Sequence, residues 1–305
     1  MKPVILLDYG NLFIKAGFSS EPSKISLTPR ICAIKVKLKL RYGEKLKLKG
    51  ELKNEMIAEE AKDNFPCLDF RNCNFDDYNE YEYELVNIWD YIFSKKLNLN
   101  SNELKERKIM ILEKTSILKL DDRRSKIWKK LELIFERFHF GYCYFEYLPK
   151  LAFISLGIES GIMLDIGENN TNATPFSQGS ILKNQVQEID VGGKKITDYL
   201  FQLLQRRGYF FDPFSYYDID IVRKLKEDHC FVSSNIKEQN LLDCESITLP
   251  DGKKINISNE KYAATEVLFN PYMVPKGTIF EQKGIDDVLY RAIKVRNIFL
   301  FFLGL

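Results

Sequence analysis

Two Asp-x-Gly motifs, one in each half of the chain, place the strongest constraint on its fold. Asp8-Tyr9-Gly10 follows the apolar run Val4–Leu7, and Asp165-Ile166-Gly167 closes the apolar run Gly161–Ile166. An apolar run that ends in Asp and Gly is typical of a buried strand that leads into a tight turn. Since each half contains one such turn, we expect two similar α/β halves, and an interface between such halves is a common ligand site.

Turns of this kind can bind a phosphate group and its metal ion. Their backbone N–H groups point toward anions, and an Asp carboxylate can hold the water molecules around Mg²⁺. Lys15 lies on the strand that leaves the first turn, from which its side chain can reach a β-phosphate as a point charge. The alternative is that Asp8 and Asp165 are ordinary turn residues, because tight turns favour Asp and Gly in any protein.

Composition argues against several other classes of protein. A chain of 305 residues is long enough for two domains, and a formal net charge of +2 gives no general attraction to nucleic acid. The six cysteines include no C-x-x-C pair and there are two histidines, so a zinc site is not expected. No secretory leader precedes the first strand, and the apolar tail Ile298–Leu305 is too short to span a bilayer. We therefore expect a soluble intracellular protein that binds neither nucleic acid nor membrane.

Hydrophobic periodicity predicts further elements. Apolar and basic residues alternate in Ile34–Arg41 and again in Lys45–Lys49, which predicts a hairpin with lysines on one face. Lysines on an exposed edge discourage strand association and need no partner; the alternative is a basic surface for an acidic neighbour. Leu249–Gly252 is predicted to be a turn between two strands. Helices are predicted over Glu55–Asn64, Asp76–Phe93, Asp122–Phe138, Thr197–Arg207 and Ile219–Cys230.

Further motifs follow the two turns in a fixed order along the chain. They are Lys15–Phe18, Glu168-Asn169, Asp190–Lys194, Thr197–Leu200, Arg207–Tyr209, Ile221–Glu227, Leu249–Gly252, Asn259–Tyr262 and Leu268–Pro271. Together with the turns, they resemble the actin and actin-related protein family, from Met1 to about Lys294. The resemblance implies the actin-like fold, an α/β fold of the ribonuclease H-like class with two similar halves around a nucleotide cleft.

The resemblance also implies a cofactor and the residues that bind it. The cofactor is ATP or ADP with Mg²⁺. The residues expected to bind it are Asp8, Gly10, Asn11 and Lys15 in the first half, and Asp165, Gly167, Glu168, Asn169, Gly193, Arg223, Lys226 and Glu227 in the second. Asp8 and Asp165 would hold Mg²⁺ through water, and Lys226 with Glu227 would border the nucleoside. For Lys226 and Glu227, a solvated helix face is the alternative.

Four positions depart from the family pattern. Leu12 and Asn169 stand where glycine would let the backbone approach phosphate, so nucleotide binding should be weakened. Asn169 tolerates a left-handed backbone, whereas Leu12 would adopt one only at a cost. The family's water-orienting glutamine falls on Leu148 and its histidine on Asn172, and neither side chain can act as a base. Because losing such groups costs ~10²–10⁴ in rate, we assign no catalytic residue and expect little or no hydrolysis of ATP.

The family pattern also predicts the domains. Residues 1–150 would form the first half, subdomain 1, with a small β-rich subdomain 2 near residues 31–64. Residues 151–294 would form the second half, subdomain 3, with subdomain 4 near residues 192–281. The family continues with a further segment, whereas residues 295–305 resemble nothing in it. Since Val-Arg can be encoded by a sequence that matches the start of a splice donor, we hypothesise that this tail is translated intron.

Three segments, Ile88–Phe93, Lys96–Leu99 and Asn235–Gln239, are similar to one group of actin-related proteins. Members of that group are actin-like subunits of the complex that nucleates branched actin filaments. The resemblance therefore implies a cytoskeletal subunit whose partners are other actin-related and complex subunits, with actin itself as a further candidate. Its expected location is the cytoplasm, with the nucleus as the alternative.

Two other functions stay open. An active ATPase or phosphotransferase on the same fold would need a general base, for which Glu168 is the candidate. A degenerate scaffold would bind partner proteins without nucleotide. The nucleotide-binding interpretation depends on one expectation, which is that the turns at residues 8–11 and 165–169 face one another across a shared gap.

Overall fold

The computed structural model divides into two units, Met1–Leu148 and Pro149–Leu305. The residues it describes are 2–21, 24–29, 32–33, 56–57, 67–68, 86–115, 123–213, 215–233, 244–274 and 283–294. The predicted lysine-faced hairpin at residues 34–49 lies outside these ranges.

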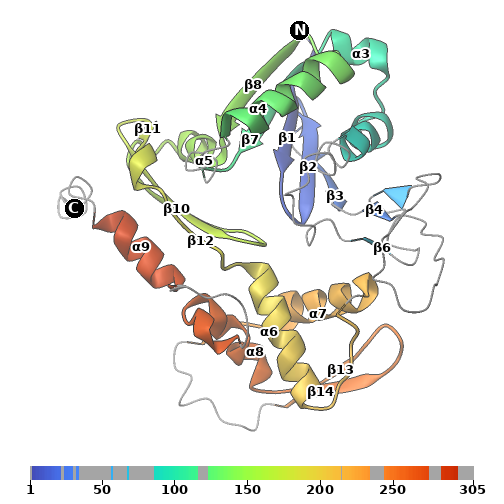
Figure 1. The fold of residues 1–305 in the computed structure, drawn as a ribbon, viewed down its shortest axis with the longest axis vertical. Helices are drawn as coiled ribbons and strands as arrows, with labels where there is room; N and C mark the ends of the chain where they lie inside the picture. Colours follow the sequence, from blue (N-terminus) through green and yellow to red (C-terminus); the bar gives the residue numbers. More distant parts are fainter. Residues whose placement is uncertain are drawn as a thin grey trace, which may run out of the picture. The chain divides into compact units, whose positions relative to one another are not determined.

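A five-stranded sheet forms the centre of unit 1 (Figure 1). Its strands in spatial order are β3 (Ser26–Pro29), β2 (Phe13–Phe18), β1 (Ile5–Tyr9), β7 (Lys108–Glu113) and β8 (Tyr142–Tyr147). β1 and β2 form the antiparallel hairpin that the sequence predicts. β7 runs parallel to β1, and β8 runs parallel to β7. Parallel neighbours require a crossover connection, and helix α4 lies in the one between β7 and β8.

Helices pack aromatic residues against this sheet. Residues 86–91 are helical and continue into the π-helical turn η2 (Ile92–Lys96), and α3 (Ser101–Lys105) follows. α4 (Arg123–Glu132) continues into η4 (Leu133–Arg137), in agreement with the predicted helix. Trp89, Phe93 and Phe138 form one aromatic cluster, in which the rings of Phe93 and Phe138 lie 5.2 Å apart and nearly perpendicular. These rings and the alternate β1 residues Ile5 and Leu7 belong to the buried core of unit 1.

A small three-stranded sheet corrects one sequence prediction. β4 (Cys32–Ala33) pairs with β5 (Met56–Ile57) on one side and β6 (Cys67–Leu68) on the other. The helix predicted over Glu55–Asn64 is therefore wrong at Met56 and Ile57. Pairing with a strand distant in sequence decides the conformation of these two residues, and such tertiary pairing commonly overrides local helical propensity.

A four-stranded sheet in unit 2 is built around β10 (Thr171–Ser177). β9 (Gly161–Ile166) pairs with one edge of β10, and β11 (Ser180–Ile181) and β12 (Gln187–Ile189) pair with the other. On one face, α9 (Ile285–Ile293) packs Val288 and Ala292 against Ala173. On the other face, Phe153 of α5 (Leu148–Leu156) stacks on Phe176 with ring centroids 4.4 Å apart. Because both faces are covered, β10 is buried from Thr171 to Phe176.

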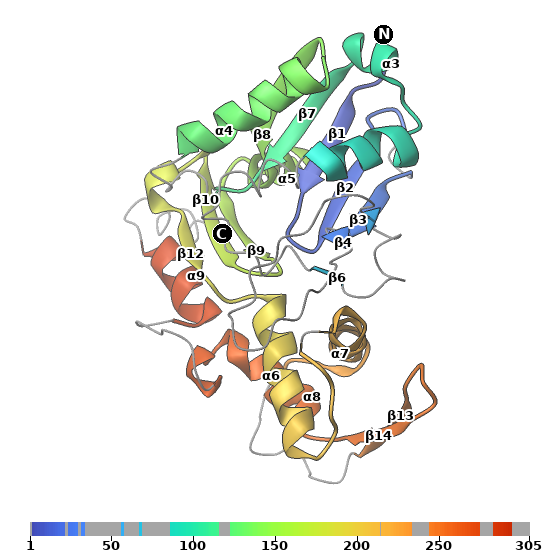
Figure 2. The same ribbon diagram turned by 45° about the vertical axis from the view of Figure 1, so that its right-hand side comes forward.

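The remainder of unit 2 is mainly helical, and Figures 1 and 2 show α6 beside α7 and α8. Its elements are η5 (Lys183–Gln185), α6 (Gly193–Arg206), α7 (Tyr216–His229), β13 (Glu245–Thr248), β14 (Lys254–Ile257), α8 (Glu260–Ala263), η6 (Thr265–Leu268) and η7 (Pro271–Met273). Leu200, Val222 and Ile255 are among the apolar residues that join α6, α7 and β14 in one core.

Two glycines with a positive φ lie where the sequence predicted a helix stop and a turn. Gly208 follows α6 with a φ of +87°, and Gly252 has a φ of +83° in the turn between β13 and β14. None of the helices in the described part of the chain has both the length and the apolar character that a membrane span requires.

Candidate functional site

The first Asp-x-Gly turn, in unit 1, joins β1 to β2. Asp8 and Lys15 are cross-strand partners, and Lys15 Nζ lies 3.3 Å from Asp8 Oδ2. The Lys15 side chain is 56% exposed, and such surface pairs contribute about 0–1 kcal/mol. A Cβ at Gly10 would lie 2.3 Å from the Phe13 carbonyl oxygen, so the turn requires glycine there. The structure thus places the predicted residues Asp8, Gly10, Asn11 and Lys15 in one hairpin.

Two side chains stand where the family pattern has glycine, and neither requires a left-handed backbone. Leu12 lies in the bend between β1 and β2, and Asn169 lies between β9 and β10. Neither has a positive φ. The left-handed conformation considered for both positions therefore does not occur, and Leu12 does not carry the conformational cost that it would have brought.

The second turn, in unit 2, caps helix α6. A hydrogen bond of 2.9 Å from Gly167 N–H to the Asn170 carbonyl closes the turn. The Gly193 N–H donates to the Gly167 carbonyl at 2.9 Å, and the Lys194 N–H donates to the Glu168 carbonyl at 2.8 Å. The first N–H groups of a helix have no partner within the helix. Turn carbonyls satisfy two of them here, so these two N–H groups are already engaged and do not point freely at a ligand.

Gly192 sets the close contact between this turn and α6. It is buried, and a Cβ at this position would lie 2.4 Å from the Gly167 carbonyl oxygen and 2.7 Å from that of Glu168. Any side chain would therefore force the turn and the helix apart. Sequence reasoning missed this role of Gly192. The sequence feature that could have indicated it is the pair of glycines, Gly192 and Gly193, just before a predicted helix.

Lys226 reaches from α7 to the start of α6. Its Nζ donates to the Gly193 carbonyl at 3.1 Å. Glu168 Oε2 lies 2.9 Å from the position that a Cβ on Gly193 would take. Burial lowers the pKa of Lys226, while the carboxylates of Glu168 and Glu227 act to raise it. The structure thus brings together Glu168, Gly193 and Lys226, three of the twelve residues that the sequence predicted to bind nucleotide.

Arg223 and Glu227 pair with each other on α7. Arg223 Nη1 donates to both Glu227 carboxylate oxygens at 2.8 and 2.7 Å, and Nη2 donates to Asp220 Oδ1 at 2.5 Å. The Arg223 side chain is buried, and ion pairs three and four residues apart support a helix. The structure therefore shows these residues holding α7 together, and their contact with nucleotide stays a prediction.

Amide oxygens gather at the second turn. The Oδ1 atoms of Asn169, Asn170 and Asn172 are buried and form no hydrogen bond within the described part of the chain. Asn172 is 2% exposed and lies directly opposite Asp165 on β9. Buried acceptors normally have a donor, so these oxygens call for water or a bound ion. Sequence reasoning missed Asn170, although the asparagine-rich run at residues 169–172 was visible.

The residues of unit 2 fit a nucleotide with a divalent cation. Carboxylate and amide oxygens, such as those of Asp165 and Asn172, are suitable ligands for Mg²⁺ or for its water shell. Lys226 adds an ammonium group beside Gly193. Within the described ranges, however, no three His, Cys, Asp or Glu side chains gather as metal ligands. A cation here would therefore depend on amide oxygens, water or phosphate for most of its coordination.

The two catalytic positions of the family pattern hold neither glutamine nor histidine in this chain. Leu148 begins α5 and has an apolar side chain, and Asn172 is an amide. His139 Nδ1 lies 3.2 Å from the Phe135 carbonyl oxygen, and His229 Nδ1 lies 2.9 Å from Glu245 Oε1. Both histidines lie outside the two turns.

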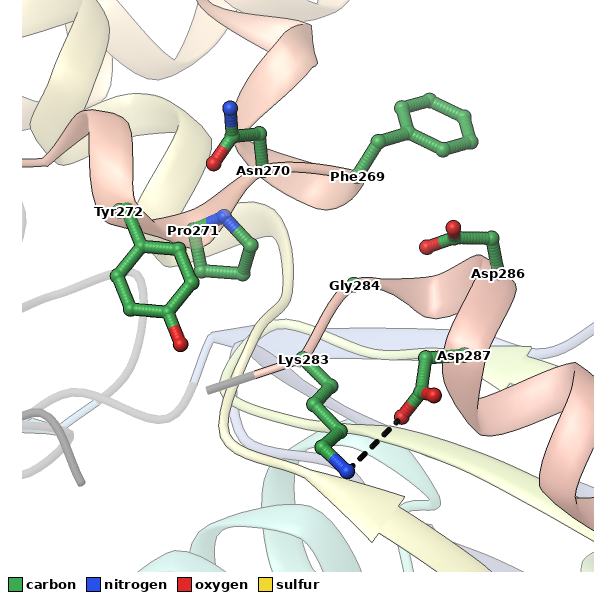
Figure 3. Close-up of a pocket in the computed structure, with 8 residues that line it drawn as sticks. All are labelled: Phe269, Asn270, Pro271, Tyr272, Lys283, Gly284, Asp286 and Asp287. Atoms are coloured by element: carbon green, nitrogen blue, oxygen red, sulfur yellow. Dashed lines mark ion pairs between the residues drawn. The ribbon is translucent and has the colours of Figure 1, made fainter. Parts of the chain in front are cut away.

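A separate hollow of about 230 Å³ lies between η7 and the start of α9 (Figure 3). Its lining residues are Phe269, Asn270, Pro271, Tyr272, Lys283, Gly284, Asp286 and Asp287. Lys283 and Asp287 form an ion pair across 3.9 Å at its rim. None of the residues predicted to bind nucleotide lines this hollow.

The family model described as "Actin" matches residues 1–300. The chain therefore belongs to the actin family, and its mixed α/β structure agrees with that fold. Proteins with this fold generally bind ATP or ADP with a divalent cation. The sequence prediction of family and fold class is confirmed.

Within the family, the chain is similar to proteins named actin-related protein 2. It is 28% identical to that of Arabidopsis thaliana over 310 residues, which cover 97% of this chain and 73% of the relative. It is 30% identical to that of Saccharomyces cerevisiae over 302 residues, covering 96% and 73%. It is 29% identical to that of Schizosaccharomyces pombe over 300 residues, covering 96% and 72%. This similarity confirms the group that the segments Ile88–Phe93, Lys96–Leu99 and Asn235–Gln239 indicated.

Proposed function

We propose that this chain is an actin-related subunit of an assembly that nucleates branched actin filaments, and that it binds ATP or ADP with little or no hydrolysis. One observation carries the nucleotide part of this proposal. Glu168, Gly193 and Lys226 come together from a turn and two helices, and the resemblance to actins implies that all three bind nucleotide. Similarity to proteins named actin-related protein 2 supports the cytoskeletal part. Its partners would be other subunits of the assembly and actin, in the cytoplasm.

The proposal gives individual residues the roles that the resemblance to actins implies. Asp8 and Asp165 hold Mg²⁺ through water, Lys15 contacts phosphate, and Lys226 with Glu227 borders the nucleoside. The bound nucleotide supplies a charged ligand that the unfolded chain does not bind. Such a ligand stabilises the fold by about 2.7 kcal/mol at a concentration of about 100 times its Kd. The nucleotide would therefore act mainly as a structural element.

The identity of two side chains supports weak hydrolysis. Leu148 cannot orient a water molecule by hydrogen bonding, and the amide of Asn172 has no useful basicity. The rival function, an active ATPase, requires Glu168 as general base. In the structure Glu168 lies against Gly193 and interacts electrostatically with Lys226, and its carbonyl accepts from Lys194. These contacts favour a role for Glu168 in holding the turn to α6.

The nucleotide part is tested by isothermal titration of the purified chain with Mg-ATP and by release of phosphate. We expect saturable binding, a Kd about tenfold higher in Lys226→Met through loss of one charged contact of about 1.5 kcal/mol, and hydrolysis at background. Lys253→Met is the matched control, because Lys253 is an exposed lysine of the same unit that forms an ion pair with Asp251 in the turn between β13 and β14. Absence of binding would contradict the proposal. Phosphate release well above background that Glu168→Gln abolishes would favour the active enzyme.

The assembly part is tested by co-purification from cells of the source organism. We expect the tagged chain to retain other actin-related subunits, and the retained amount to fall in Lys226→Met if nucleotide stabilises the bound form. Equal retention by wild type and by a variant that binds no nucleotide would support the nucleotide-free scaffold instead. Recovery of the chain alone would count against membership of any assembly.

A further inference from the structure

Three neighbouring strands of unit 2 each carry one polar residue at the same level. Asp165 on β9 lies directly opposite Asn172 on β10, and Asn172 lies directly opposite Glu188 on β12. Residues directly opposite each other in an antiparallel pair project to the same face, with Cβ atoms about 4.5–5.5 Å apart. Two carboxylates therefore flank one amide on one face of the sheet. We refer to these residues as the Asp165–Asn172–Glu188 row.

The row lies on the face of the sheet away from α9. The α9 helix covers the face that carries Ala173. Asn172 shares the opposite face with Phe176, which stacks on Phe153 of α5. The row is thus at the end of this face next to the turn at residues 167–170, whereas the Phe153–Phe176 stack covers the other end.

Asn172 is the most informative member of the row. It is 2% exposed, and its Oδ1 forms no hydrogen bond among the described residues. Leaving a buried acceptor without a donor costs about 1–3 kcal/mol. Since both of its cross-strand partners are carboxylates, the nearest side chains in the sheet add acceptors and no donors when ionised.

The adjoining turn adds two more amide oxygens. The Oδ1 atoms of Asn169 and Asn170 are also buried without a hydrogen bond in the described ranges. Asn170 Nδ2 donates to Glu188 Oε1 at 2.5 Å, so the donor end of this amide holds the Glu188 carboxylate in place. The result is a concentration of oxygen acceptors on adjoining backbone that is fixed by strand pairing.

Clusters of carboxylate and amide oxygens are suited to hard divalent cations. Ca²⁺ is bound by carboxylate and Asn oxygens at about 2.3–2.6 Å, and Mg²⁺ by one or two carboxylates while it keeps several waters. Zinc and copper are favoured by thiolate and imidazole, which the row does not contain. We propose that the Asp165–Asn172–Glu188 row binds a hard divalent cation, Mg²⁺ or Ca²⁺, in the absence of nucleotide.

This inference extends the proposed function, because Asp165 is common to both, but it requires no nucleotide. Asn172 supplies a neutral oxygen at the centre of the row, and Asp165 and Glu188 supply the compensating charge. The position that the family pattern gives to a histidine would thereby serve ion binding in this chain.

The test uses the full chain after removal of nucleotide and metal by EDTA and dialysis. Calorimetric titrations with CaCl₂ and with MgCl₂ distinguish the two ions, and Mn²⁺ electron paramagnetic resonance provides a second readout. For a site with two carboxylates we expect a Kd of about 10⁻⁴–10⁻³ M. Glu188→Gln should weaken binding at least tenfold. Asn172→Asp, which adds a third carboxylate, should tighten binding by a similar factor.

Glu159→Gln is the matched control, because Glu159 is an exposed carboxylate of the same unit outside the row. It should bind the ion as wild type does. Circular dichroism checks that each variant is folded. If Asn172 only packs the sheet, Asn172→Asp should bind the ion no more tightly than wild type does.

Wild type without saturable binding of any of the three ions would overturn the inference and would leave water as the partner of Asn172. Equal affinity in wild type and Glu188→Gln would also overturn it. Metal binding without Mg-ATP binding would uphold this inference while the proposed function fails. Mg-ATP binding without binding of metal alone would give the reverse outcome.

Discussion

The two Asp-x-Gly turns have the same motif but satisfy their polar groups in different ways. The first turn depends on its own hairpin, where Asp8 pairs with Lys15 and Gly10 packs against the Phe13 carbonyl. The second turn is held by α6, whose Gly193 and Lys194 N–H groups donate to it. A motif of three residues therefore specifies a turn, but its surroundings decide whether the turn is a local or a tertiary structure.

This difference has consequences for the effects of mutation. A change in the first turn disturbs contacts between residues a few positions apart, which can relax together at the surface. A change in the second turn disturbs a junction between a sheet and a helix, where buried backbone groups have fixed partners. We therefore expect the second turn to be the more sensitive of the two.

The largest expected effect is that of Gly192→Ala. The added Cβ meets two backbone carbonyls at 2.4 and 2.7 Å and would separate the turn from α6. We expect a loss of about 3 kcal/mol or more from the free energy of unfolding of unit 2, since overpacking and lost hydrogen bonds add. Hydrogen exchange of the α6 amides measures it. Both tryptophans, Trp89 and Trp128, lie in unit 1, so their fluorescence transition should be unchanged.

Gly10→Ala is the matching change in the first turn. Its Cβ meets one carbonyl, that of Phe13, in a turn that is only partly buried. It should therefore destabilise unit 1 by less than Gly192→Ala destabilises unit 2, and tryptophan fluorescence in urea reports it. A larger effect of Gly10→Ala would reverse the comparison.

A smaller effect is expected from Lys226→Met. Burial lowers the pKa of Lys226, so the unfolded chain binds this proton more tightly than the folded chain. Stability contributed at this position therefore increases as the pH rises from the lowered pKa toward the ordinary value of 10.5. In urea titrations, the free energy of unfolding of Lys226→Met minus that of wild type should therefore decrease over that pH range. The lost hydrogen bond to Gly193 lowers this difference by about 1 kcal/mol at every pH. A difference that is independent of pH would show that Lys226 is not buried as a charge.

The smallest effect is expected from Lys15→Met. The Lys15 side chain is 56% exposed, although that of Asp8 is 18% exposed, so removal of this pair should cost less than about 1 kcal/mol. The cost should decrease further between 0.01 and 1 M NaCl, because the screening length falls from about 30 to about 3 Å. Urea unfolding at both salt concentrations measures it. A cost that is large and independent of salt would place Lys15 in a more buried setting than its exposure indicates.

Local patterns predicted the parts of the fold that depend on neighbouring residues. The β1–β2 hairpin, the strand Gly161–Ile166 and the end of α6 at Gly208 follow from apolar runs and glycine. The start of α6 could not be found in this way. It begins at Gly193 and not at the predicted Thr197, because its first N–H groups are satisfied by a turn about 25 residues earlier.

In the candidate site, too, some residues could be predicted from the sequence, and others depend on contacts between distant segments. The resemblance to actins supplied Glu168, Gly193 and Lys226, which the structure brings together. It included Gly192 in a motif but gave no sign of its packing role, which depends on a backbone contact. It gave no sign of Glu188, which is aligned with Asn172 only by strand register. Contacts of both kinds link residues that no local periodicity relates.

The central position of β1 in its sheet has a consequence for biosynthesis. Ile5 pairs with Phe18 on one side but with Ile109 on the other, about 100 residues later in the chain. At a translation rate of about 5–20 residues per second, β1 waits roughly 5–20 s before its second neighbour is made. During that interval, a hairpin with one unpaired edge is exposed near the ribosome, and an open edge is a template for pairing with other chains. The β1 edge of the nascent hairpin therefore stays open to such pairing until β7 has been made.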